Sequence, residues 1–387
     1  MSARRVLLFT HWAPNVLVFR RRLLELLLAR GTEVLVVAPD APDYPRAELR
    51  AMGAECETVP GKSNALDPRT AYAVRRKLRA ILRSWQPDVV LSFSHYPNVA
   101  MAGALDGLPP RRWFATVSGR GRLFQPARDP LATLLRRAAS RILVRKYRRV
   151  GKLAAGVLTL NPDDLALVQR WSPELREKAT LLPLGEGADV ERFRVDAALR
   201  AEWRREQGYG ENDVVCAFVG RFMREKGVET FLDLAEADRD ANRKWLLVGR
   251  SDLGGDGDID LRIGELRNAG KLRVLPWQND LRPLYNGIDF LIHPSIGEGM
   301  PVAPIEAIGC GASVLLLDAP GSRELPKAGN GCKALATTAP KTWFSALDEW
   351  SASNRTERAA AARATAERFD ARIAAAEIAR ILDGEAE

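Results

Sequence analysis

Cysteine and histidine are scarce in this chain of 387 residues, with four and three copies respectively. The cysteines are scattered and form no Cys-x-x-Cys pair, which argues against a zinc site and favours reduced thiols. The longest charge-free stretch, residues 89–105, contains Ser, His, Pro and Asn, so it is too short and too polar to span a bilayer. Arg4 and Arg5 precede the first strand pattern without the apolar core of a secretory signal. These absences predict a cytoplasmic protein that holds no metal.

Length and composition indicate two ordinary domains. A content of 46% hydrophobic and 28% charged residues is typical of a globular protein. A length of 387 residues exceeds what a single hydrophobic core usually supports. Residues 1–190 carry 31 Lys and Arg against 17 Asp and Glu, whereas residues 191–387 carry 27 against 32. The first half is therefore strongly basic and is expected to meet an anionic surface, either nucleic acid or acidic lipid.

Short apolar runs alternate with helical patterns along both halves, which predicts parallel sheets covered by helices. A helix is expected over 15–30, and a long helical pattern over 355–383 that could pack on either domain. The linker is expected within 185–200. The predicted strands are 6–10, 33–38, 88–93, 113–117 and 156–160 in the first half, and 214–219, 244–248, 272–275, 288–293 and 312–317 in the second.

The most informative segment is HPSIGEGMPVAPIEAIGCG, residues 293–311. An apolar strand ends here, a glycine-rich turn follows, and a short helix begins, with Glu298 in the turn and Glu306 in the helix. A helix N-terminus presents unpaired amides and partial positive charge, which suits a phosphate. The two carboxylates could then accept hydroxyl groups of a phosphorylated ligand, so this loop is predicted to be the active-site loop.

A second loop, GRFMREKG at 220–227, follows the first strand of the second half. Gly220 allows close approach of a ligand to the backbone, and Arg221 and Lys226 could hold a diphosphate. The alternative is a solvated loop with ordinary basic residues, and the proximity of the Glu298 loop in the predicted sheet favours the phosphate site.

Together, GRFMREKG and EGMPVAPIE resemble the nucleotide-sugar half of the GT-B glycosyltransferases, specifically the retaining family 4, also called glycosyl transferases group 1. The glutamates at 298 and 306 match that family's Glu–seven residues–Glu motif. Looser matches, such as GSRELPKAGNG at 321–331 and LTLNPDDLALV at 158–168, extend the resemblance over nearly the whole chain. It implies an α/β fold of two Rossmann-like domains facing across a cleft that closes by a hinge.

The resemblance also implies the domain roles. Residues 1–190 would bind the acceptor, with a C-terminal helix at about 369–387 packing back on them, and residues 191–368 would bind the nucleotide sugar. Glu298 would contact the transferred sugar and Glu306 both ribose hydroxyls. Members of the family are generally metal-independent, so no cofactor is expected, and Asp256-Gly257-Asp258 is interpreted as a surface turn instead of a metal motif. The implied donor-binding residues are Gly220, Arg221, Lys226, Gly299, Met300, Pro301 and Glu306.

SFSHYPNVAMAG at 92–103 and TVSGRGRLF at 116–124 resemble the subgroup that builds bacterial surface polysaccharides, such as lipopolysaccharide or capsule, on lipid-linked acceptors. His95 lies where many relatives place a histidine, and it is predicted to be catalytic together with Glu298; a satisfied structural histidine is the alternative. His293 is expected to be structural. The remaining predicted acceptor-side residues are His11, Trp12, Ser118, Gly119 and Arg120.

Residues 131–152 combine an apolar stripe, at Leu131, Leu134, Leu135, Ile142 and Leu143, with a basic face. A basic amphipathic helix of this kind predicts contact with the anionic inner face of the cell membrane. A core-packed helix with a solvated outer face is the alternative, and both can hold. No nucleic-acid-reading module is visible, so nucleic acid is not expected as a partner. The predicted membrane-facing residues are Arg136, Arg137, Arg141, Arg145, Lys146, Arg148 and Arg149.

Three rival functions are weighed against transfer of a sugar from a nucleoside-diphosphate donor to a lipid-linked or polysaccharide hydroxyl. An NAD oxidoreductase would need the third glycine that follows Gly119-x-Gly121 in the dinucleotide fingerprint, and it is missing. A nucleotide-sugar epimerase is disfavoured by the glutamate spacing and the basic first half. A scaffold without turnover should have lost some of the site residues named above.

Overall fold

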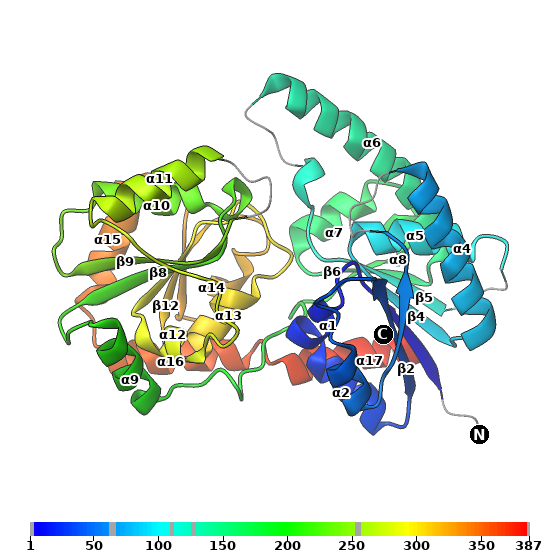
Figure 1. Cartoon of the computed structure of the whole chain (residues 1–387), viewed down its shortest axis with the longest axis horizontal. Coiled ribbons are helices and arrows are strands. Elements are labelled where there is room, and N and C mark those ends of the chain that lie inside the picture. The colour runs from blue at the N-terminus through cyan, green and yellow to red at the C-terminus, as the bar shows by residue number, and fades with distance from the viewer. Residues whose placement is uncertain (1–3, 62–66, 109–111, 125–128, 252–256, 385–387) are drawn as a thin grey trace. The chain divides into compact units, whose positions relative to one another are not determined.

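Two compact units make up the protein in the computed structural model, which describes residues 4–61, 67–108, 112–124, 129–251 and 257–384 (Figure 1). One unit comprises Met1–Gly187 with Ala371–Glu387, and the other comprises Ala188–Asp370. These bounds lie within three residues of the expected ones. The chain passes between the units twice, and a parallel bridge between Ala188 and Asp370 holds the two crossing points side by side.

The first unit is a parallel sheet of seven strands in the order β3-β2-β1-β4-β5-β6-β7. Its strands are β1 (Arg5–Phe9), β2 (Glu33–Pro39), β3 (Glu55–Val59), β4 (Val89–Phe93), β5 (Arg112–Val117), β6 (Gly156–Thr159) and β7 (Ala179–Leu181). Its helices are α1 (Pro14–Phe19), α2 (Arg21–Ala29), α3 (Arg46–Met52), α4 (Pro68–Trp85), α5 (His95–Leu105), the 3-10 helix η1 (Arg122–Phe124), α6 (Pro130–Leu153), α7 (Pro162–Gln169), α8 (Pro173–Lys178) and α17 (Ala371–Asp383).

The second unit is a parallel sheet of six strands in the order β10-β9-β8-β11-β12-β13. Its strands are β8 (Val214–Arg221), β9 (Arg243–Arg250), β10 (Arg273–Leu275), β11 (Phe290–His293), β12 (Ser313–Leu317) and β13 (Cys332–Leu335). Its helices are α9 (Ala197–Gln207), the 3-10 helix η2 (Arg224–Lys226), α10 (Val228–Ala237), α11 (Gly257–Asn268), α12 (Arg282–Gly287), α13 (Val302–Gly309), α14 (Glu324–Ala328), α15 (Pro340–Ser351) and α16 (Arg355–Glu367).

Both sheets are doubly wound, and the direction of winding reverses next to the first strand of each sheet. The reversal lies between β1 and β4 in the first unit and between β8 and β11 in the second. Ligands of open parallel sheets bind at such switch points, beyond the carboxyl ends of the strands. The loops that follow these four strands are therefore the places to search for the site.

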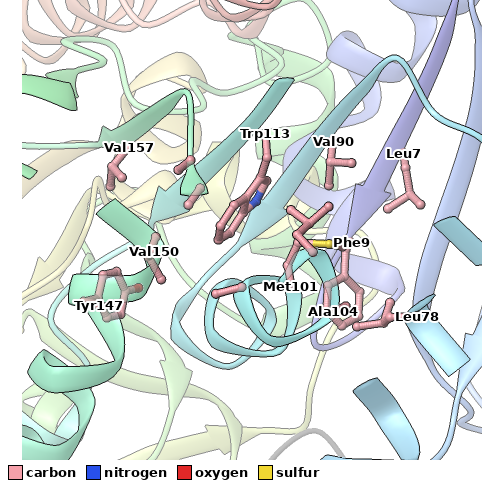
Figure 2. Close-up of a cluster of buried hydrophobic side chains, with 14 of the residues drawn as sticks. Leu7, Phe9, Leu78, Val90, Met101, Ala104, Trp113, Tyr147, Val150 and Val157 are labelled. Carbon is pink, nitrogen blue, oxygen red and sulfur yellow. The ribbon is translucent and has the colours of Figure 1, made fainter. Parts of the chain in front are cut away.

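The cores lie where the apolar strand patterns predict. In the first unit, Trp113 of β5, Met101 of α5 and Phe9 of β1 belong to one buried cluster, and Tyr147 of α6 lies at one side of it (Figure 2). The ten strands predicted from sequence all form, with ends within two residues. Strands β3, β7 and β13 were not predicted, because they are short or alternate with polar residues and lack an apolar run.

Two predicted helices are each divided in two. The helix expected over 15–30 breaks at Arg20, whose backbone leaves the helical region and whose side chain is buried against Glu186. The helical pattern at 355–383 breaks at Phe369 and Asp370, where the chain passes from one unit to the other. The last helix, α17, packs on α2 of the first unit, so the C-terminal segment does return to the N-terminal part of the chain.

Candidate active site

Lys226 and Glu298 meet at the switch point of the second sheet. Lys226 belongs to the loop after β8, and Glu298 to the loop after β11, the strand that pairs with β8. The Lys226 ammonium lies 2.6 Å from Oε1 and 2.8 Å from Oε2 of Glu298, so one cation binds both carboxylate oxygens. The two loops that were predicted to bind a donor are thus joined by an ion pair.

Two further groups hold the Glu298 carboxylate. The Ser295 hydroxyl lies 2.9 Å from Oε1, and Nε2 of the buried His293 lies 3.5 Å from the same oxygen. Burial disfavours the ionised form, but the charge and hydrogen bonds of Lys226, together with the nearby imidazole of His293, outweigh it and hold the pKa of Glu298 far below its usual range. Glu298 is therefore a fixed anion at neutral pH.

Two glycines let these loops approach each other. Gly227 has a φ of +77°, and a Cβ there would lie 2.1 Å from the carbonyl oxygen of Pro294. Gly321, with a φ of +80°, would place a Cβ 2.5 Å from the carbonyl oxygen of Glu298. Any side chain at either position would push the Glu298 loop away.

Helix α13 begins directly after this loop. Pro301 is its N-cap residue and offers no side-chain cap, so the amides of the first turn depend on other acceptors. Met300 and Pro301 are buried, which leaves backbone instead of side chain as the means by which this turn could contact a ligand. A helix terminus of this kind suits a phosphate, and phosphate binding here stays a prediction.

Glu306 lies one turn further into α13 and has a very different environment from Glu298. Burial raises its pKa to about 8, although the charge of Arg192 and the Tyr285 hydroxyl both act to lower it. One carboxylate of the predicted pair is thus firmly ionised, while the other binds a proton near neutrality. The difference fits two separate roles for the two glutamates.

The other predicted donor residues line the same edge. Gly220 and Arg221 end β8, paired with Gly249 and Arg250 of β9, and Arg221 is exposed. Asp258, once weighed as part of a metal motif, lies in the first turn of α11 and pairs with Arg224; Asp256 is outside the described residues. Across the described parts of the chain, no group of three or more His, Cys, Asp or Glu side chains is arranged to hold a metal.

His95 anchors a chain of hydrogen bonds through the first unit. Because the Arg120 carbonyl 3.1 Å from Nε2 can only accept, Nε2 carries the proton and Nδ1 accepts from the Tyr147 hydroxyl at 2.8 Å. That hydroxyl in turn accepts from Asn98 at 3.0 Å. The chain continues from Asn98 through Ser92 to the indole of Trp113.

This geometry favours the alternative of a satisfied structural histidine over the prediction that His95 is catalytic. Both ring nitrogens bind protein atoms, and burial lowers its pKa, so the ring is neutral and fixes the loop of Ser118, Gly119 and Arg120. Arg120 also bonds Asp164 at 2.9 Å. The Ser118 hydroxyl is buried without a hydrogen-bond partner among the described residues. We therefore interpret His95 as a positioning residue for this loop.

His11 and Trp12 follow β1, at the switch point of the first sheet. The Trp12 indole donates to Asp43 at 2.7 Å. Nδ1 of His11 lies 3.1 Å from the hydroxyl of Ser94, which follows the neighbouring strand β4. Ser94 was not selected from the sequence, where its only signal is its position at a strand end, and the structure identifies its contact with His11.

Helix α6 spans the predicted basic segment, but its apolar stripe has two parts. Leu143 is buried in the core together with Tyr147 and Val150. The remaining stripe residues are exposed, from 53% for Ile142 to 62% for Leu131. Figure 1 shows the amino-terminal half of α6 projecting from the other helices of the first unit. Of the predicted basic residues, six are exposed and Arg136 is partly buried, and Arg149 pairs with Asp106.

A cavity of about 400 Å³ lies at the opposite, amino-terminal edge of the second sheet. Two of its cations bind helix C-terminal carbonyls: Lys271 donates to the carbonyl of Asp238 at 3.1 Å, and Arg273 to that of Gln207 at 2.6 Å. These are ordinary capping contacts. The cavity therefore has a structural explanation and does not compete with the switch point as the candidate site.

Comparison with known proteins agrees with this geometry. The family model described as glycosyl transferases group 1 matches residues 200–368, and the model described as glycosyltransferase family 4 matches residues 18–183. The N,N'-diacetylbacillosaminyl-diphospho-undecaprenol alpha-1,3-N-acetylgalactosaminyltransferase of Campylobacter jejuni is 23% identical, over 83% of this chain and 82% of its own. The GDP-mannose-dependent alpha-mannosyltransferase of Mycolicibacterium smegmatis is 27% identical, over 79% of this chain and 76% of its own.

Among solved structures, Anabaena HepE in complex with UDP and glucose superposes with a TM-score of 0.75 at 17% identity, covering 97% of this chain and 99% of its own. That likeness shows the fold, two Rossmann-like units of the GT-B type. The rival interpretations as an oxidoreductase, an epimerase or an inactive scaffold are not supported by any of these matches. This chain is a glycosyltransferase of the family 4 type with the GT-B fold.

Proposed function

We propose that the chain transfers a sugar, with retention of anomeric configuration, from a nucleoside-diphosphate sugar to a hydroxyl of a lipid-linked or polysaccharide acceptor in bacterial surface-glycan synthesis. The observation that carries the proposal is the ion pair of Lys226 and Glu298 beside the N-terminus of α13. The second unit would bind the donor and the first unit the acceptor.

Donor binding would redistribute the contacts of this pair. The diphosphate attracts Lys226 and Arg221 and the first-turn amides of α13, and Glu298 then accepts hydroxyls of the transferred sugar while Glu306 accepts those of the ribose. Fixed cations and a helix terminus stabilise the departing diphosphate, so no metal is needed for that charge.

Retention requires the acceptor to attack from the face that the diphosphate leaves. The bond from the anomeric carbon to the phosphate oxygen breaks, and the bond to the acceptor oxygen forms on the same face. The departing phosphate takes the acceptor proton. Because the phosphate accepts this proton, the scheme requires no protein base. This agrees with the engagement of both His95 nitrogens by protein atoms.

The relatives support the substrate classes. The name of the Campylobacter jejuni enzyme specifies a diphospho-undecaprenol acceptor, and that of the Mycolicibacterium smegmatis enzyme a GDP-mannose donor. Both fit a chain that meets nucleotide sugars and lipid-linked glycans. The structure of the second unit favours no particular base.

A lipid-linked acceptor would bring the protein to a membrane, and α6 is suited to that contact. Leu131, Leu134, Leu135 and Ile142 recur at spacings of three, four and seven residues and form one exposed apolar face. Arg141 and Arg145 of the same helix are exposed and supply positive charge near this apolar face. No helix in the described ranges is long and apolar enough to cross a bilayer. We infer that α6 lies in the interface of an anionic inner membrane and holds a cytoplasmic protein there.

The function is tested by incubating the protein with UDP-, GDP- and dTDP-sugars, with and without membrane extract, in the presence and absence of EDTA. Nucleoside diphosphate release that requires the extract and resists EDTA is expected. Nuclear magnetic resonance of the product reports the anomeric configuration. An inverted linkage, or release that EDTA abolishes, would contradict the corresponding part of the proposal.

Membrane contact is tested by flotation with vesicles of phosphatidylcholine alone or with phosphatidylglycerol. We expect binding only with the anionic lipid, weakened by salt and by the double substitution Leu134→Asp and Leu135→Asp. The matched control changes Leu261, which is 72% exposed on α11 of the second unit, to Asp. Equal flotation of the α6 variant and the control would refute a role for α6.

A further inference from the structure

Ser94 has a backbone conformation that serine rarely adopts. Its φ is +75° and its ψ is 170°, a region that is essentially restricted to glycine. The backbone is nonetheless well bonded. Its amide donates to the carbonyl of Thr116 at 2.9 Å, and its carbonyl accepts from the amide of Asn98 at 3.1 Å. A glycine would make the same two bonds without strain, so the fold itself does not require a side chain here.

The Ser94 side chain also forgoes the role that serine usually plays at this position. Ser94 is the N-cap residue of α5, where a serine hydroxyl normally accepts from an amide of the first turn, but it makes no such bond. Its hydroxyl instead lies 3.1 Å from Nδ1 of His11. Ser94 thus has neither a relaxed backbone nor a capping hydrogen bond, and its side chain makes the contact with His11 instead. That contact joins the loops that follow two neighbouring strands.

The contact lies at the switch point of the first sheet, between β1 and β4. A buried ion pair packs on the end of the same strand, β4. The guanidinium of Arg20 stacks 3.8 Å above the ring of Phe93, the residue before Ser94, and pairs with the buried carboxylate of Glu186. A hydroxyl beside an imidazole can both donate to and accept from a sugar hydroxyl, and it suits that group better than a phosphate.

We propose that Ser94 and His11 together bind and position the acceptor, through a hydroxyl of its sugar, at the switch point of the first sheet. The inference rests on the proposed function and adds to it a residue pair that recognises the acceptor. The strained backbone of Ser94 is then the consequence of keeping a hydroxyl where the fold would favour glycine.

The test is a comparison of Ser94→Gly and Ser94→Ala. Both remove the hydroxyl, but only glycine also relieves the backbone. The acceptor probe is a short-chain prenyl diphosphate-linked N-acetylhexosamine, and octyl glycosides serve as a second set. We expect kcat/KM for the acceptor to fall at least tenfold in both variants, while the Kd of the donor stays within twofold. The Tm of Ser94→Gly should equal or exceed that of the unsubstituted protein and should exceed that of Ser94→Ala.

Gln86→Gly is the matched control, because Gln86 is the other residue besides glycine with positive φ in the described chain, at 49°, and it caps α4. It should raise the Tm without changing transfer. His11→Gln should reduce acceptor kcat/KM, and combining it with Ser94→Gly should add little.

Transfer by Ser94→Gly with acceptor kinetics within twofold of the unsubstituted protein would overturn the inference, as would a Tm below that of Ser94→Ala. Absence of transfer by the unsubstituted protein to every probe, with donor binding intact, would instead count against the proposed function. The two failures are therefore distinguishable.

Discussion

The pKa of Glu306 predicts that donor binding depends on pH in a specific direction. In the ligand-free protein this pKa is raised by burial to about 8, so most molecules are protonated at neutral pH. A carboxylate that accepts two ribose hydroxyls must be ionised. Donor binding should therefore release a proton, and the Kd should increase as the pH falls below 8.

The size of the effect follows from the ionised fraction. With a pKa of about 8 the fraction falls from roughly three quarters at pH 8.5 to about 3% at pH 6.5, so the Kd should rise about 25-fold. Of the groups in contact with Glu306, burial raises the pKa of Tyr285 well above its usual range and that of Cys310 to about 12. Neither titrates over this range. Asp189 and Arg192 also act on Glu306 through their charges.

The assay is calorimetric titration with a nucleotide sugar, whose esterified diphosphate does not titrate in this range. Running it at each pH in two buffers of different ionisation enthalpy gives the number of protons released. Glu306→Gln should bind weakly and show no pH dependence. A Kd that changes less than threefold between pH 6.5 and 8.5, or a pH dependence that persists in Glu306→Gln, would refute the assignment.

The same shift has a consequence for stability. The folded pKa of Glu306 lies above its unfolded value, near 4.5, so the stabilising effect of the protonated form is complete below pH 4.5 and is lost as the pH rises toward 8. Glu306→Gln cannot ionise, so its Tm relative to the unsubstituted protein should increase between pH 5 and pH 8.5. A constant difference would show that the carboxyl group ionises normally.

Three further predictions concern the contacts around the two switch points. Lys226→Met should leave the Glu298 carboxylate uncompensated and lower the free energy of unfolding by about 2 kcal/mol at pH 7 and by less at pH 4, as measured by urea denaturation; equal losses would contradict the ion pair. Gly227→Ala should destabilise the protein by more than Gly208→Ala, which has a similar φ of +74° and nothing within 4 Å, because only at Gly227 does a Cβ meet backbone; equal losses would refute the clash. Tyr147→Phe should cost about 1–3 kcal/mol, because it leaves His95 and Asn98 each with an unmet hydrogen bond, and no loss of Tm would contradict the hydrogen-bond chain.

Much of the fold, and the meeting of the two loops in the second unit, was predictable because both depend on local patterns. Apolar runs mark strands, and the residues after β8 and β11 must meet if both strands are central and parallel. The pairing of Lys226 with Glu298 was not predicted, because each was assigned to a different part of the donor. The break at Arg20 was missed for a related reason: the pattern of 15–30 continues through it, and the contact with Glu186 comes from a residue far along the chain.

The contacts at the corresponding edge of the first unit were predicted less well, because they depend on tautomer and backbone conformation. His95 was singled out as a histidine after a strand, but its partners Tyr147 and Arg120 come from distant segments and engage both nitrogens. Ser94 was passed over, although it precedes His95, because a φ of +75° cannot be read from a serine in the sequence.

The two units apply one topological rule to different chemistry. In each sheet, the loops after the two strands that flank the switch point bring one polar residue each to it. These residues are His11 and Ser94 after β1 and β4, and Lys226 and Glu298 after β8 and β11. The order of the strands determines that these residues meet, whatever their identity. The residue types then determine the ligand. A cation and a carboxylate suit a diphosphate and a sugar bound together, whereas a hydroxyl and an imidazole suit a sugar hydroxyl alone, so the proposed division between donor and acceptor would follow from four side chains placed by the same fold.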